Sequence, residues 1–181
     1  MPRNFADRLS AVAPSATLAM AARATRLRSQ GHKVFPFSVG EPDFDTPQFI
    51  REAAAVALAA GASHYTPVSG TSALRHAVCA ATERDRGYSV SPDQITISCG
   101  AKHALFNLAL ALYDPGDEVI IPAPYWVSYP EQVRIVGANP VIVETHVQDG
   151  FRLDPVSLER AITSRTKAII PVHLYGHPCD L

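Results

Sequence analysis

The chain has 181 residues, a formal net charge of −1 and 47% hydrophobic residues, which suffices for one substantial core and gives no electrostatic reason to expect nucleic acid or an anionic membrane as a partner. No run of about 18 apolar residues occurs, so no membrane-spanning segment is expected. Three widely spaced cysteines and seven scattered histidines match no disulfide framework and no metal site, which favours a reduced, cytoplasmic protein without a metal.

The first helix is expected over residues 16–30, with Ser15 as its cap and Gly31 as its stop. Residues 1–30 carry five arginines and are rich in alanine and serine. Organelle transit peptides share this composition, and so does an arm followed by an amphipathic helix, which is the interpretation we favour. A short strand is expected next, over residues 34–38.

Two more helices are expected in the first half of the chain. Thr46 as a cap and Pro47 at the first helical position predict a helix that ends at Gly61. The following helix is expected over residues 72–86. A polar loop between the two helices holds Tyr65, which is either an ordinary surface residue or one that reaches another molecule.

From residue 95 onward, β-branched runs alternate with helix-forming runs. Strands are expected over residues 95–98, 118–122, 140–144 and 167–172, and helices over residues 102–113, 127–136 and 154–162. Strands separated by helices of about ten residues indicate a largely parallel sheet that is covered on both faces. The predicted fold class is therefore α/β.

The break between the first of these strands and its helix is the strongest local candidate for a binding site. Gly100 and Ala101 let a ligand approach the backbone, and the helix that follows presents amides at the positive end of its dipole. These features suit a phosphate. Lys102 either adds charge to this site or projects into solvent. The pattern is neither a Walker loop nor a dinucleotide fingerprint, which argues against an NTPase or a dehydrogenase.

Trp126 is the single tryptophan of the chain and lies in a proline-bounded loop after the strand expected at 118–122. A lone tryptophan in such a place is often part of a core. Open α/β sheets, however, bind ligands at the carboxyl ends of their strands. Trp126 is therefore also a candidate to stack on a flat ring, while Tyr125 and Tyr129 are expected to support it by packing.

Four motifs occur in order along the chain: Gly40–Pro47, Tyr65–Gly70, Gly100–Lys102 and Pro124–Pro130. Through these motifs the chain resembles the class I (fold type I) pyridoxal-phosphate aminotransferases, and most of all their bacterial aspartate and aspartate/prephenate branch. The resemblance implies the PLP-dependent transferase fold of type I, an α/β fold. It also implies that residues 1–45 are an arm and first helix belonging to the small domain, and that residues 46–181 are an incomplete large domain.

The resemblance implies roles for the candidate residues. Gly100, Ala101 and Lys102 would seat the phosphate of pyridoxal 5′-phosphate, and Trp126 would stack on its ring. Tyr65 would reach across a homodimer to the neighbour's cofactor phosphate. The backbone of Gly40 would contact the substrate carboxylate. The complete enzyme would transfer an amino group between an amino acid of the aspartate or glutamate type and a 2-oxo acid.

The chain also departs from the family it resembles. The family's Schiff-base lysine lies beyond residue 181, and none of Lys33, Lys102 and Lys167 matches it. We therefore expect the N-terminal half of such an enzyme, inactive alone. From Ile169 onward the sequence is similar instead to sugar-nucleotide aminotransferases of the same fold. Two alternatives stay open: a sugar aminotransferase, and a non-catalytic remnant that binds phosphate or forms dimers.

Overall fold

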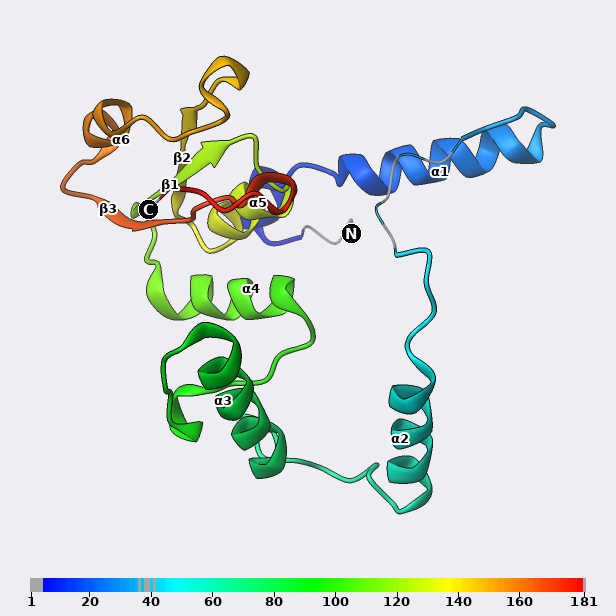
Figure 1. Ribbon diagram of the computed structural model, residues 1–181. Coiled ribbons are helices and arrows are strands. Elements are labelled where there is room, and N and C mark those ends of the chain that lie inside the picture. Colours follow the sequence, from blue (N-terminus) through cyan, green and yellow to red (C-terminus); the bar gives the residue numbers. More distant parts are fainter. Residues whose placement is uncertain (1–4, 36, 38–39, 41, 181) are drawn as a thin grey trace. The chain divides into compact units, whose positions relative to one another are not determined.

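The computed structural model describes residues 5–35, 37, 40 and 42–180 (Figure 1). By its contacts the chain divides into two compact units. The first, here named the sheet unit, comprises residues 1–34 and 102–181, and the second, the helical unit, comprises residues 35–101. Among the described helices, none has the length and apolar character needed to cross a membrane.

The sheet unit contains the strands β1 (Glu118–Ala123), β2 (Asn139–Glu144) and β3 (Thr166–Ile169). Its α-helices are α1 (Ala16–Ser29), α4 (Ala101–Leu112), α5 (Ser128–Ile135) and α6 (Pro155–Ala161), and its short 3-10 helices are η1 (Asp7–Ala11), η3 (Val147–Asp149) and η4 (Leu174–Gly176). The helix expected after Ser15 and the strands and helices expected from residue 102 onward are confirmed. Their ends differ from the expected ones by a few residues at most.

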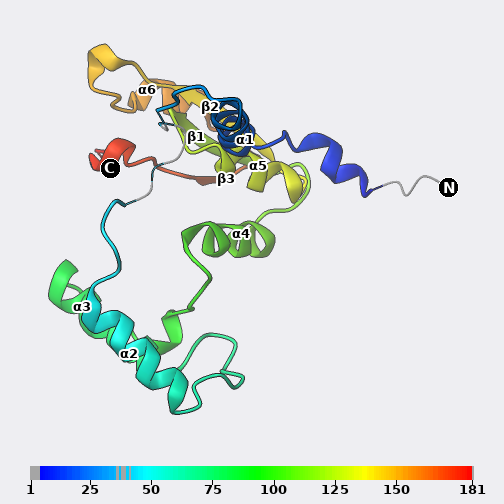
Figure 2. The ribbon, with the colours of Figure 1, turned by 90° about the vertical axis from the view of Figure 1, so that its right-hand side faces the viewer.

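The three strands form one parallel sheet in the order β2-β1-β3, so β1 is paired on both sides. This arrangement confirms the expected parallel sheet. Val119, Ile120 and Ile121 of β1 are fully buried, as a β-branched run in a sheet covered on both faces should be. Val119 and Ile121 share a buried cluster with Val133 of α5 and with Ala138. Both views show α5 beside the sheet (Figures 1 and 2), so β1 and α5 form the core of this unit.

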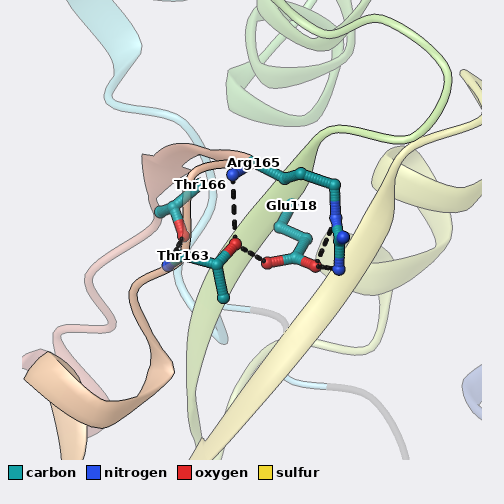
Figure 3. Close-up of polar contacts among 4 residues, drawn as sticks. All are labelled: Glu118, Thr163, Arg165 and Thr166. Carbon is teal, nitrogen blue, oxygen red and sulfur yellow. Dashed lines mark hydrogen bonds and ion pairs between the residues drawn. The ribbon is translucent and has the colours of Figure 1, made fainter.

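Glu118, at the start of β1, is a buried carboxylate that is 6% exposed. The hydroxyl of Thr163 donates to Oε2 at 2.6 Å, and the Arg165 guanidinium donates to Oε1 through Nε at 2.9 Å and through Nη2 (Figure 3). The Thr163 hydrogen bond first, and the Arg165 hydrogen bond second, hold the pKa of the Glu118 carboxyl below its ordinary value. This network joins the segment that leads into β3 to the first residue of β1.

The helical unit contains α2 (Gln48–Ala59), α3 (Ser72–Arg86) and the 3-10 helix η2 (Pro92–Gln94). The expected bounds of α3 are confirmed, and the Thr71 hydroxyl caps it by accepting from the Leu74 amide. The expected cap of α2 was wrong. Pro47 rather than Thr46 occupies the N-cap position, because its ψ of 139° is extended and keeps it outside the helix.

The strand expected over residues 95–98 was wrong. These residues belong to no strand, and the amide of Ile97 donates to the carbonyl of Ser69, in the loop before α3, at 3.0 Å. A β-branched run becomes a strand only when a second extended segment pairs with it residue by residue, and a loop does not provide that pairing. The strand expected over residues 34–38 falls partly outside the described residues, and its described members are not in a strand.

Gly70 occupies a position of the helical unit where a side chain does not fit. Its φ is 99°, and a Cβ built there would stand 2.8 Å from Cβ of Ile97. We expect Gly70→Ala to lower the free energy of unfolding by about 2–4 kcal/mol, because a left-handed backbone and overpacking each cost stability. Urea unfolding measures this loss. Gly61 has a φ of 88° but open space around it, so Gly61→Ala isolates the backbone cost, and equal losses in both variants would contradict the packing role.

Candidate functional site

The helix α4 begins within the predicted phosphate seat, the segment Gly100–Lys102. Gly100 has a φ of 84°, no described atom within 4 Å of where its side chain would stand, and an amide that donates to the Ser98 carbonyl at 2.8 Å. Gly100 therefore turns the chain into the helix. The first amides of an α-helix have no carbonyl partner in their own helix and lie at the positive end of its dipole. The amides that follow Gly100 are thus suited to an anion.

Trp126 and Lys102 lie together in the sheet unit. Trp126 follows the carboxyl end of β1 and is 49% exposed. The ammonium nitrogen of Lys102 is 5.8 Å from the centroid of the indole ring, which is within the range of a cation–π contact. The expected packing of Tyr125 and Tyr129 is confirmed, because both are partly buried against the core cluster. Trp126 therefore lies in a segment that is anchored to the core on both sides, and about half of its surface stays exposed.

A cleft of about 620 Å³ lies beside Trp126. Residues 12–18, from the arm and the first turn of α1, form one side, and α5 forms another; Lys102 of α4 also lines the cleft. The Glu131 carboxylate of α5 accepts a hydrogen bond from the Ala13 amide at 2.9 Å. This contact holds the arm against α5 at the edge of the cleft.

Sequence reasoning missed two residues of α5 that make contacts at this cleft. Glu131, besides its contact with the arm, accepts from the Arg134 guanidinium at 2.5 Å. Gln132 donates from Nε2 to the backbone carbonyl of Lys102 at 2.7 Å. No signal in the sequence marks either residue, because charged and polar side chains on a short helix ordinarily face solvent.

Tyr65 and Gly40 belong to the helical unit, whereas Lys102 and Trp126 belong to the sheet unit. Tyr65 lies in a loop and is fully exposed, and Gly40 lies outside the helices and strands. Their roles toward a neighbouring protomer and a substrate stay predictions. Among the described residues, no group of three or more His, Cys, Asp or Glu side chains is placed to hold a metal ion.

A family model described as aminotransferase class I and II matches residues 32–173. The chain belongs to this family. Class I aminotransferases depend on pyridoxal 5′-phosphate. The resemblance expected from the motifs is therefore confirmed. The fold is that of the PLP-dependent aspartate aminotransferases, present here as a partial α/β domain with a parallel sheet and flanking helices.

Aminotransferases from two bacteria are similar to this chain over nearly all of its length. The aspartate/prephenate aminotransferase of Thermus thermophilus is 49% identical over 168 residues, which are 93% of this chain and 44% of the relative. The aspartate aminotransferase of Geobacillus stearothermophilus is 48% identical over 167 residues, which are 92% of this chain and 42% of the relative. The solved structure of the Thermus thermophilus aspartate aminotransferase with maleate matches with a TM-score of 0.88 and 49% identity, over 92% of this chain and 44% of that one. The chain thus spans less than half the length of these relatives.

Trp126, Lys102 and the beginning of α4 offer the groups that a phosphorylated heterocycle needs. The half-exposed indole of Trp126 offers an aromatic face, the ammonium of Lys102 offers a positive charge beside it, and the beginning of α4 offers backbone amides. These are the three kinds of contact by which a flat, phosphorylated pyridine is bound.

Proposed function

We propose that this aminotransferase chain supplies the cofactor-binding part of an enzyme that transfers an amino group between an aspartate- or glutamate-type amino acid and a 2-oxo acid. The observation that carries the proposal is the pairing of Lys102 with Trp126 beside the start of α4. The names of the relatives, which are aspartate and aspartate/prephenate aminotransferases, support the substrate class.

Three groups of this chain would hold pyridoxal 5′-phosphate. The amides that follow Gly100, at Ala101 and Lys102, would bind the phosphate. The indole of Trp126 would lie against the pyridine ring and keep it flat, and the ammonium of Lys102 would balance the phosphate charge. When bound, the cofactor supplies an aldehyde and an electron-withdrawing ring, which together stabilise negative charge on the substrate's α-carbon.

Two residues of the helical unit would have roles of their own. Tyr65 would donate to the cofactor phosphate of a second protomer in a homodimer, and Gly40 would contact the substrate carboxylate through its backbone. Residues 1–45 would belong to the small domain and residues 46–181 to the large domain. The family match over residues 32–173 includes both Tyr65 and Gly40, which supports these assignments.

We place the Schiff-base lysine on a further segment and expect the chain to be inactive alone. Lys167 is exposed and lies at the amino end of β3, whereas Trp126 follows the carboxyl end of the parallel strand β1. Opposite ends of a parallel sheet cannot share one site. Lys102 is engaged with the indole face. A non-catalytic remnant is the second candidate for the chain by itself, and the sugar aminotransferase alternative depends on the residues after Ile169 alone.

We propose the cytoplasm as the compartment of this protein. None of Cys79, Cys99 and Cys179 forms a disulfide, as is usual where thiols are kept reduced. Alkylation of the protein in a fresh cell extract, without prior reduction, should label all three thiols. A disulfide-linked pair under these conditions would contradict the assignment.

The test uses pyridoxine 5′-phosphate, which keeps the ring and the phosphate but has no aldehyde to react with surface lysines. Binding is followed through the fluorescence of Trp126, the single tryptophan. We expect saturable quenching, with pyridoxine binding at least about tenfold more weakly because it lacks the charge-assisted hydrogen bonds of the phosphate. Equal affinities, or quenching that inorganic phosphate does not reverse, would contradict the site. Aspartate–2-oxoglutarate turnover is expected only when a C-terminal half that carries a lysine is added.

A further inference from the structure

Gln132 makes a side-chain hydrogen bond from α5 to α4. Its Nε2 donates to the backbone carbonyl of Lys102, in the first turn of α4, at 2.7 Å. The helix that holds Gln132 begins at Ser128, directly after the loop of Trp126. One bond therefore connects the helix that begins at the phosphate seat with the helix that begins beside the indole.

This hydrogen bond is not required to satisfy the backbone. Within an α-helix the carbonyl of Lys102 already faces the amide four residues ahead, and a carbonyl oxygen has a second lone pair for Gln132. The consequence of the bond is geometric. Lys102 is held at two points, by Gln132 at its carbonyl and by contact of its ammonium with the Trp126 ring at 5.8 Å.

The helix α5 is held in place by contacts other than the Gln132 hydrogen bond. The helix is anchored to the sheet through Val133, which is fully buried in the core cluster, and it packs against β1, β2 and η1. Its backbone approaches that of α4 less closely than it approaches these elements. Gln132 is only partly buried and lines the cleft beside Trp126, so it is not needed to fill the core. Its contact with α4 is thus separable from the stability of α5.

We propose that Gln132 is a positioning residue that sets the distance between the phosphate seat and the ring-binding face of Trp126. The inference rests on the proposed function, in which one ligand occupies both subsites. The phosphate and the ring of such a ligand are joined by a short rigid link. A change in the spacing of the subsites therefore weakens the binding of a ligand that spans both, here called the joined ligand. A ligand that occupies only one subsite is unaffected, because each subsite stays intact.

The test compares Gln132→Met, which keeps the length of the side chain but removes the donor, with Gln148→Met in the exposed 3-10 helix η3. Affinities are measured by NMR for pyridoxine 5′-phosphate, inorganic phosphate and pyridoxine. We expect Gln132→Met to weaken the binding of pyridoxine 5′-phosphate about 3- to 10-fold, as the loss of one hydrogen bond predicts. The affinities for phosphate alone and for pyridoxine alone should change less than about twofold. Gln148→Met should bind all three ligands as the wild type does.

A second readout needs no ligand. The single tryptophan gives one indole N–H signal, which should shift in Gln132→Met and stay in place in Gln148→Met. An unchanged indole signal together with unchanged affinity for pyridoxine 5′-phosphate overturns the positioning role. Equal losses of affinity for phosphate alone and for the joined ligand also overturn the positioning role, because they indicate damage to the phosphate seat itself. If Gln132→Met does not fold, Gln132→Glu, whose carboxylate keeps the shape but cannot donate, replaces it.

The two proposals fail in different ways. If the wild-type protein does not bind pyridoxine 5′-phosphate, the proposed function is wrong. The indole signal then decides the role of Gln132 alone: a shift in Gln132→Met supports its positioning of Trp126, and an unshifted signal overturns it.

Discussion

Replacing Trp126 with alanine is expected to weaken the binding of pyridoxine 5′-phosphate about 10- to 100-fold. The indole is 49% exposed and its neighbours Tyr125 and Tyr129 pack against the core, so part of the ring is available to a ligand. Burial of a ring against such a face contributes about 1.5–3 kcal/mol, and each step of about 1.4 kcal/mol changes affinity tenfold. Because the variant has no tryptophan, the measurement is equilibrium dialysis followed by the absorbance of the ligand.

Two control variants separate the ring of Trp126 from its surroundings. Trp126→Phe keeps an aromatic face and should lose less than about fivefold in affinity. Tyr125→Phe removes only a hydroxyl from a neighbour that packs against the core, and it should bind like the wild type. If Trp126→Ala binds pyridoxine 5′-phosphate as tightly as the wild type, the ring lies elsewhere and the proposed site is wrong.

Replacing Glu118 with alanine is expected to lower the midpoint of thermal unfolding by several degrees. The variant loses the acceptor of the Thr163 hydroxyl and of the Arg165 guanidinium, and it leaves a gap beside a strand that is paired on both sides. Glu118→Gln keeps the volume and one acceptor oxygen, so its loss should be smaller. Asp85, whose ion pair with Arg84 is exposed on α3, provides the control: Asp85→Asn should have little effect, because exposed pairs contribute little.

The Glu118 network also predicts how stability depends on pH. The Thr163 hydrogen bond and then Arg165 lower the pKa of Glu118 in the folded chain, so the folded state favours the ionised form. The contribution to stability is therefore complete above the unfolded pKa, about 4.3 for a glutamate. It is lost as the pH falls through the lower folded pKa. Thermal unfolding between pH 7 and pH 3 (roughly the range that spans this titration) should show a steeper acid loss for the wild type than for Glu118→Gln, and parallel curves would contradict the role of the network.

The elements of the sheet unit could be predicted because local signals agree with the tertiary structure. Val119–Ile121 is a β-branched run that ends up fully buried, and Asp154 caps α6 by accepting from the Val156 and Ser157 amides, as its place before a proline suggests. The run over residues 95–98 has the same local signal and forms no strand. Its outcome depends on a pairing partner, which local sequence does not encode.

The candidate site could be predicted in part for a similar reason. Gly100 and Trp126 stand at the ends of predicted elements, where turn chemistry and strand ends mark a ligand site. The contact of Gln132 with Lys102 joins residues 30 positions apart, and the Glu131 contact with Ala13 joins residues 118 positions apart. Contacts between a side chain and the backbone of a distant element follow from packing, and no periodicity or motif in the sequence identifies them.

The measurement that bears most directly on the proposed cofactor site is an NMR titration of the isotope-labelled chain with pyridoxine 5′-phosphate. We expect the backbone amides of Ala101 and Lys102 and the indole N–H of Trp126 to shift together, with one common dissociation constant. Inorganic phosphate should shift the amides and leave the indole nearly unchanged. Shifts confined to other parts of the chain, or an indole signal that responds without the amides, would contradict the proposed cofactor site.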